Sequence, residues 1–291
     1  MRSGIGKASA CASATVVNAI ATGKGAAFGV ELRVRARAEL IKGKGKIRGR
    51  IIGGGGESAR LIEICARKVL EILGMEREYG VRIETDAGIP IAVGLSSSSA
   101  AANAAVLATY AAAGADPDMD RALELGIDAS LEAGVSVTGA LDDAAASMYG
   151  CGVVTHNLKR VILRKFRIRT DLDVLVYIPP SKFYSSAVTP QSLAPIRKAV
   201  EIAHDLAMRG RIMDAISLNG VLYSTALNQD PTPAIEAIAE GALGAGLTGT
   251  GSATVAISEP NVSRRIEEMW KKRPGRVLRL KPSREGARVE P

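Results

Sequence analysis

The sequence predicts a mixed α+β fold of two lobes, and three observations lead to this fold class. The chain has 291 residues, more than the roughly 100–200 residues of a typical single domain. Hydrophobic residues make up 47% and charged residues 23%, which allows a sizeable core and excludes a disordered chain. Strand and helix patterns follow one another in both halves, with a change near residues 155–170. We therefore expect lobes at residues 1–160 and 161–291.

The N-terminal half is expected to form a sheet that is covered by helices. Its second strand alternates Val30, Leu32 and Val34 with charged residues, as half-exposed strands do. Strands are expected at residues 14–20, 29–40, 81–85, 153–155 and 161–163. Apolar residues at helical spacing predict helices at residues 57–73, 100–113, 120–133 and 141–148.

The C-terminal half is expected to alternate helices and strands. Helices are expected at residues 196–208, 212–227, 233–242 and 262–272. Strands are expected at residues 174–178, 254–257 and 277–280. The glycine-rich stretch 244–251 interrupts these elements and is expected to be a loop.

Composition excludes several classes of function. The net charge is +8, but the basic residues cluster in residues 33–50 and 264–288 and only 3% of residues are aromatic, so we expect solvated basic surfaces and no nucleic-acid partner. Three scattered cysteines and two histidines predict neither a disulfide framework nor a zinc site nor Ser-His-Asp catalysis. This cysteine usage is typical of a cytoplasmic protein. The sequence makes no prediction about oligomeric state.

One uncharged stretch has the length of a membrane span but not its composition. Residues 87–115 contain no Asp, Glu, Lys or Arg, which satisfies the length criterion. The first half of the stretch holds proline, glycines and four serines, and the second half is mostly alanine. We therefore expect no membrane segment here, and the polar residues 8–15 do not resemble a signal peptide.

The strongest chemical signal is PIAVGLSSSSAAANAAVLA at residues 90–108. Gly94 allows the backbone to approach a phosphate closely, and Ser96, Ser97, Ser98 and Ser99 offer hydroxyl and backbone donors. The helix that follows presents free N–H groups and its positive dipole end at the same place. The alternative is a serine N-cap on a packed alanine helix, although one serine would suffice for capping.

A second glycine-rich loop, GAGLTGTGS at residues 244–252, precedes an apolar strand. Taken alone it is equally well explained as a tight turn. The Walker pattern GxxxxGK[ST] is absent, because alanines follow Gly23-Lys24-Gly25. A Walker-type kinase is thus not expected.

The two loops together resemble the signature motifs of the GHMP kinases. Pro-x-x-x-Gly-Leu-x-Ser-Ser and, about 150 residues later, Leu-Thr-Gly-x-Gly-Ser stand in the order of the second and third motifs, and TVVNAIATGKGAAFGVEL at residues 15–32 resembles the first motif region. The resemblance spans nearly the whole chain. It is strongest to the archaeal-type shikimate kinases, since Ser96 and Ser99 stand where most members carry glycine and alanine.

This resemblance implies an N-terminal α/β lobe and a C-terminal ferredoxin-like α+β lobe, with ATP and Mg²⁺ between them. It implies ATP-dependent phosphorylation of the 3-hydroxyl of shikimate, a small-molecule acceptor. The residues implied to bind ATP are Pro90, Ile91, Ala92, Val93, Gly94, Leu95, Ser96, Ser97, Ser98, Ser99, Ala100, Thr248, Gly249, Gly251 and Ser252.

The resemblance also suggests catalytic, metal and acceptor residues. Gly139-Ala140-Leu141-Asp142-Asp143 resembles the family segment that carries a catalytic aspartate, so Asp142 is the candidate base and Asp143 could exchange roles with it. Both could instead be dipole-stabilising carboxylates at a helix start. Ser98 and Glu132 are the candidate magnesium ligands.

The acceptor's carboxylate requires a cation. Lys24, between two glycines, and Arg60, after the four-glycine run, are the candidates, although either could be a surface charge. Two alternatives to shikimate kinase remain open. One is another GHMP kinase acting on homoserine or a mevalonate-type acceptor, and the other is a non-catalytic nucleotide-binding protein.

Overall fold

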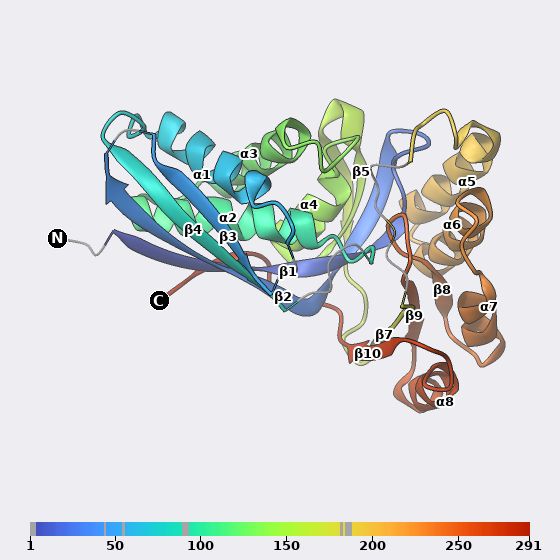
Figure 1. Ribbon diagram of the computed structural model, residues 1–291. Coiled ribbons are helices and arrows are strands. Elements are labelled where there is room, and N and C mark those ends of the chain that lie inside the picture. The colour runs from blue at the N-terminus through green and yellow to red at the C-terminus, as the bar shows by residue number, and fades with distance from the viewer. Residues whose placement is uncertain (1–3, 44, 54–55, 89–92, 181–182, 184–187) are drawn as a thin grey trace.

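The computed structural model contains two β-sheets with helices packed against them (Figure 1). It describes the chain except residues 1–3, 44, 54–55, 89–92, 181–182 and 184–187. The first sheet has the central strand order β11-β1-β2-β4-β3, with β5 paired to β2 and β6 to β5. Its strands are β1 (Ile5–Val17), β2 (Lys24–Lys42), β3 (Ile47–Ile52), β4 (Tyr79–Ala87), β5 (Gly152–His156), β6 (Val161–Phe166) and β11 (Arg288–Glu290).

Four helices cover one face of the first sheet, as Figure 1 shows. They are α1 (Arg60–Ile72), α2 (Ser97–Ala113), α3 (Met119–Glu132) and α4 (Leu141–Tyr149). α2 is almost entirely buried and is built mainly of alanine, so its backbone can lie close to the sheet. Gly6 of β1 permits this approach, because a Cβ there would lie 2.2 Å from the carbonyl oxygen of Ala108.

The other face of the first sheet carries the basic residues of β2. Val34, Ala36 and Ala38 are buried, so strand alternation places the arginines between them on the opposite face. There Arg37 pairs with Glu39 of the same strand, and Glu39 also pairs with Arg82 of the neighbouring strand β4. The expectation that this basic run forms a solvated surface therefore agrees with the structure.

The second sheet is antiparallel, with strand order β10-β7-β9-β8. Its strands are β7 (Asp173–Ile178), β8 (Gly244–Leu247), β9 (Thr254–Ser258) and β10 (Arg276–Leu280). Its helices are α5 (Arg197–Met208), α6 (Ile212–Ala226), α7 (Thr232–Ala239) and α8 (Pro260–Trp270). Helices between the first and second strands and between the third and fourth make this the ferredoxin-like arrangement, as the sequence resemblance implied.

The structure departs from the sequence expectations at strands that are rich in small residues. β8 occupies residues that we expected to be a loop, and β1 begins at Ile5, well before the expected start at residue 14. Gly246 in β8 is required by packing, because a Cβ there would lie 2.8 Å from the Cα of Gly220 in α6. Close helix–strand packing thus requires small residues such as glycine. Because these residues have low strand propensity, the strand is not recognised from the sequence. The exposed strand β3 was not predicted either.

The two sheets share one core, and the chain passes between them more than once. Along the chain, strands up to β6 belong to the first sheet, and β7 to β10 form the second. The last strand, β11, lies at the edge of the first sheet. A single cluster of buried side chains includes residues of both sheets, for example Ala8 and Val255. None of the helices that the structure describes is long and apolar enough to cross a membrane.

Candidate active site

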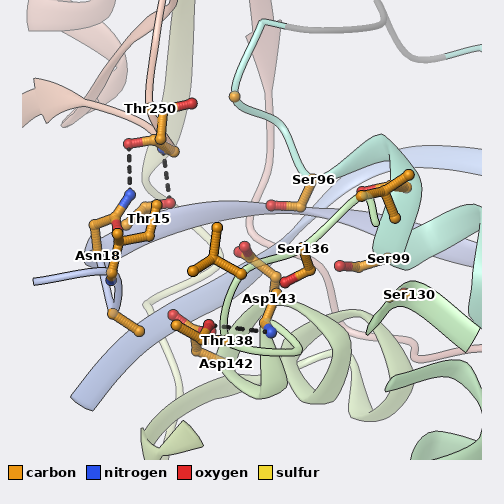
Figure 2. A pocket seen from close by; sticks show the side chains of 18 of the residues that line it. Thr15, Asn18, Ser96, Ser99, Ser130, Ser136, Thr138, Asp142, Asp143 and Thr250 are labelled. Atoms are coloured by element: carbon orange, nitrogen blue, oxygen red, sulfur yellow. Dashed lines mark hydrogen bonds between the residues drawn. The ribbon is translucent and has the colours of Figure 1, made fainter. Parts of the chain in front are cut away.

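A pocket of about 320 Å³ lies where the two sheets meet, a volume typical of small-molecule sites. Figure 2 shows Thr15, Asn18 and Thr250 on one side, Ser99 and Ser130 on the other, and Asp142 and Asp143 between them. The described lining comes mainly from four segments distant in sequence: the end of β1 and the turn after it, the serine loop, the segment 130–143, and the loop 249–251; Glu57 and Phe183 also contribute.

The serine loop leads directly into the N-terminus of α2. Ser96 adopts a left-handed conformation, with φ 52°, and no side chain caps the helix. The hydroxyls of Ser96, Ser97 and Ser98 are only half-buried and line the pocket. Because no serine caps the helix, the hydroxyls of Ser97 and Ser98 and the first N–H groups of α2 are available to an anion, which argues against capping as the reason for four serines.

The two glycine-rich loops pack backbone against backbone. Gly94 has φ +89°, and a Cβ on it would lie 2.0 Å from the carbonyl oxygen of Thr248. A Cβ on Gly249, which has φ +60°, would lie 2.8 Å from the Cα of Gly94. The Thr248 hydroxyl donates to the Gly94 carbonyl at 2.9 Å. Residues 93–108 and 244–252, the described parts of the two motifs, therefore form one structural unit.

The end of β1 is hydrogen-bonded to the second of these loops. The Thr15 N–H donates to the Thr248 hydroxyl at 3.0 Å, and the Gly249 N–H donates to the Thr15 hydroxyl at 2.8 Å. The Asn18 amide donates to the Gly249 carbonyl at 2.9 Å. Thr15 and Asn18 belong to the first motif region but had not been chosen as site residues, because their type alone carries no catalytic signal.

Asp142 lies in the first turn of α4 and is only 4% exposed. Its Oδ1 accepts a hydrogen bond of 2.8 Å from the Asn157 amide. Burial, and then the neighbouring charge of Asp143, raise the pKa of Asp142 to about 7. Its Oδ2 lies against Gly25 of β2, where a Cβ would come within 2.2 Å. Asp142 is thus a confined carboxylate that titrates near neutral pH.

Asp143 faces the serine loop. Its Oδ1 accepts a hydrogen bond of 2.9 Å from the Ser13 hydroxyl, and the Ser96 hydroxyl is a further donor to it. Burial raises its pKa as well, against the effect of these two donors. Both aspartates stand in the first turn of α4 and also line the pocket, so their position is compatible with either of the two roles.

The structure brings most of the predicted phosphate and catalytic residues together. Those that line the pocket are Gly94, Ser96, Ser97, Ser98, Ser99, Asp142, Asp143, Gly249 and Gly251. Five others are buried close to these positions in sequence: Val93, Leu95, Ala100, Thr248 and Ser252. Pro90, Ile91 and Ala92 lie outside the described residues.

Three predicted residues are not brought into the described lining of the pocket. Lys24 is adjacent to Gly25, but only Gly25 faces Asp142, and the charge of Lys24 acts on His204 of α5. Arg60 begins α1 with an exposed side chain. The carboxylate of Glu132 pairs with Arg67 and Lys68 on α1, which holds its pKa below the usual range. The structure therefore does not support Glu132 as a metal ligand.

Sequence reasoning also missed a polar strip that lines the pocket before α4. Ser130, Ser136 and Thr138 present hydroxyls there, and Val135 and Val137 alternate with them. The strip precedes the Gly139 turn, and its alternation of small polar and apolar residues was the one available signal.

Comparisons with known proteins agree with this geometry. Residues 60–151 match the family described as the GHMP kinases N terminal domain. Proteins named shikimate kinase from Methanothrix thermoacetophila and Methanothermobacter thermautotrophicus are 41% and 43% identical to the chain. These alignments cover 98% and 95% of this chain, and 96% and 95% of the relatives. The chain belongs to the GHMP kinases.

Solved structures of other GHMP kinases share the whole fold. Homoserine kinase from Cytophaga hutchinsonii matches with a TM-score of 0.77 and 19% identity, covering 98% of this chain and 97% of that one. Mevalonate kinase from Methanococcus jannaschii matches with a TM-score of 0.72 and 14% identity, covering 95% and 98%. The family and fold predicted from the sequence are therefore confirmed.

Proposed function

We propose that this GHMP kinase is a shikimate kinase that transfers the γ-phosphoryl group of ATP to the 3-hydroxyl of shikimate. The observation that carries the proposal is the 41–43% identity to proteins named shikimate kinase over at least 95% of either chain. The homoserine and mevalonate kinases match at 19% identity or less, which supports a shared fold and not a shared acceptor.

The serine loop and the N-terminus of α2 are proposed to bind the ATP phosphates. The donors that support this role are the uncapped N–H groups of α2 and the hydroxyls of Ser97 and Ser98. Gly94 is required for the close contact of the serine loop with Thr248 and Gly249, because any side chain at Gly94 would collide with Thr248. The site thus binds phosphate through backbone geometry and hydroxyls without a Walker lysine.

Mg²⁺ fits the donor set of this pocket. The side chains there offer oxygen donors, which suit a hard cation, and the described lining contains Asp142, Asp143 and Glu57 but no Lys or Arg. No group of three or more His, Cys, Asp or Glu gathers as a metal site among the described residues. When bound, Mg²⁺ neutralises phosphate charge, and we propose Ser98 as its protein ligand.

Asp142 is proposed to be the general base. It accepts the proton of the acceptor hydroxyl as that oxygen bonds to the γ-phosphorus and the bond from phosphorus to ADP breaks. A carboxylate that titrates near pH 7 is far better matched to this task than one with an ordinary aspartate pKa of 3.8. Thr138 and Asn18 also line the pocket, and their polar side chains can bind the remaining acceptor hydroxyls.

The test is an ADP-release assay with ATP and Mg²⁺, adding shikimate, homoserine or mevalonate separately. Turnover with shikimate alone supports the proposal. Turnover with another acceptor would keep the kinase and reject the substrate. ATP binding without turnover on any of the three would favour the non-catalytic alternative.

A further inference from the structure

Asp142 is hydrogen-bonded to a buried network of side chains that has no part in the proton transfer proposed above. Asn157 follows β5 directly and is 2% exposed, and it does not line the pocket. Both hydrogens of its side-chain amide are used: Nδ2 donates to Asp142 Oδ1 at 2.8 Å and to the Thr138 hydroxyl at 3.2 Å. One amide thus connects the aspartate with the polar strip.

The orientation of this amide is determined by a third residue. The Thr155 hydroxyl donates to Asn157 Oδ1 at 2.6 Å and has the Gly25 carbonyl as a longer alternative acceptor at 3.2 Å. A hydroxyl has a single proton to donate, and the shorter contact directs it to the oxygen of Asn157. The NH₂ end of the amide must therefore point toward Asp142, since a flipped amide would place an oxygen against the carboxylate.

The two oxygens of Asp142 consequently have different surroundings. Oδ1 is held by Asn157, while Oδ2 lies against the Cα side of Gly25, on the strand paired with Thr155. The carboxylate is fixed in position and in rotation by neighbours that never reach the substrate. Second-layer contacts of this kind hold a reacting group in its productive geometry.

We propose that Asn157, oriented by Thr155, is a positioning residue that holds Asp142 and keeps it ionised for proton abstraction. This inference rests on the proposed role of Asp142 as general base. A hydrogen bond donated to the charged form of a carboxyl lowers its pKa, so Asn157 opposes the effect of burial. Without Asn157, Asp142 would remain protonated to a higher pH and lose its ability to accept a proton.

The other groups near Asp142 are accounted for. Asp143 on the same helix raises its pKa, and the Tyr223 phenol on α6 is close enough to interact with its charge. Lys24 and His156, at the paired ends of β2 and β5, lie near His204 on α5. Of the side chains named in this paragraph, Asn157 alone donates a hydrogen bond to Asp142.

The test compares Asn157→Leu with wild type by two readouts. The first is the ¹³C titration of aspartate-labelled apo protein, in which the Asp142 step is identified by its loss in Asp142→Asn. Asn157→Leu should raise this step by about one pH unit or more, because it removes a hydrogen bond to a charged group. The second is the pH profile of kcat/KM, which should fall about tenfold at pH 7 and recover toward wild type at high pH.

Matched variants separate positioning from general loss of structure. Asn103 is also fully buried, and its amide donates to the Ala144 carbonyl of α4 at 2.9 Å, so Asn103→Leu removes a comparable bond without touching Asp142. It should leave the Asp142 titration unchanged. Thr155→Val should shift the titration in the same direction as Asn157→Leu but less, and Thr155→Ser should restore it. If Asn157→Leu does not fold, the comparison of Thr155→Val with Thr155→Ser decides whether Asn157 controls the titration of Asp142.

Two results would overturn the inference. One is an apparent pKa of Asp142 that is the same as in wild type in both Asn157→Leu and Thr155→Val. The other is a loss of kcat/KM that is equal at every pH, which a merely structural role predicts. The titration requires no substrate, so a failure of the proposed function would appear separately, as absence of ADP release by wild type with shikimate.

Discussion

Gly25→Ala is the substitution for which the structure predicts the sharpest effect on catalysis. The added Cβ would lie 2.2 Å from Oδ2 and 2.7 Å from Cγ of Asp142, far inside van der Waals contact. It cannot retreat, because the Cβ of Ala19 lies at 3.0 Å and Gly25 is paired with Thr155 across the sheet. The carboxylate must therefore move by about 1 Å, a displacement that can cost about 10²-fold in rate.

Steady-state ADP release at saturating ATP and acceptor measures this effect. We expect kcat to fall by about 10²-fold, with the KM for ATP nearly unchanged because the serine loop is not disturbed. The double variant Gly25→Ala with Asp142→Asn should be no slower than Asp142→Asn alone, since both act on one group. If instead the loss of kcat in the double variant is the sum of the two single losses in free energy, Gly25 acts on a group other than Asp142.

Gly126→Ala in α3 is the matched control. A Cβ there meets its nearest neighbour at an ordinary 3.4 Å, and alanine is favoured over glycine in a helix by up to about 1 kcal/mol. This variant should keep wild-type kcat and gain slightly in Tm. If Gly25→Ala also retains kcat within about threefold, then the close confinement of Asp142 has no role in the reaction.

Further predictions concern the base, the phosphate loop and the surface carboxylate. Asp142→Asn should lower kcat by roughly 10²–10⁴, and wild-type kcat/KM should rise with pH through about 7 to a plateau. The folded pKa of Asp142 lies above the unfolded value of 3.8, so wild-type stability should decline from about pH 4 to 7, and thermal melts at pH 8 should show a higher Tm for Asp142→Asn. Gly94→Ala, forced against the Thr248 backbone at φ +89°, should cost ~2 kcal/mol or more in denaturant unfolding and weaken ATP binding. Glu132→Gln should leave the Mg²⁺ dependence of kcat unchanged, because the carboxylate is already paired with Arg67 and Lys68; a large shift in that dependence would restore it as a metal ligand.

Sequence reasoning was most accurate where the pattern was long and periodic or rich in unusual residues. Helices α2 and α4 begin within three residues of their predicted starts, and the serine run lies at the pocket as expected. Single charged residues were harder to place. Lys24 stands next to Gly25, which lies against Asp142, yet strand alternation turns Lys24 away, and one residue of register decides between the two outcomes.

Residues that act through partners in distant segments could not be recognised from the sequence. Asn157 and Thr155 have ordinary surroundings in sequence, and their relation to Asp142 exists only because β2 and β5 pair and α4 packs beside them. The same holds for Thr15 and Asn18, whose partners lie more than 230 residues away in the loop 248–249. Such contacts are set by topology, on which a local pattern carries no information.

Small residues explain both the errors in the fold and the success at the site. Gly6 and Gly246 lower the strand signal, yet they let β1 approach α2 and β8 approach α6 closely. The contact between Gly94 and Gly249 uses the same device to join the two phosphate motifs. A site that binds phosphate through backbone N–H groups needs such close approach more than it needs charged side chains. Close backbone packing thus explains both the glycines that obscured strands β1 and β8 and the glycines that join the two loops at the pocket.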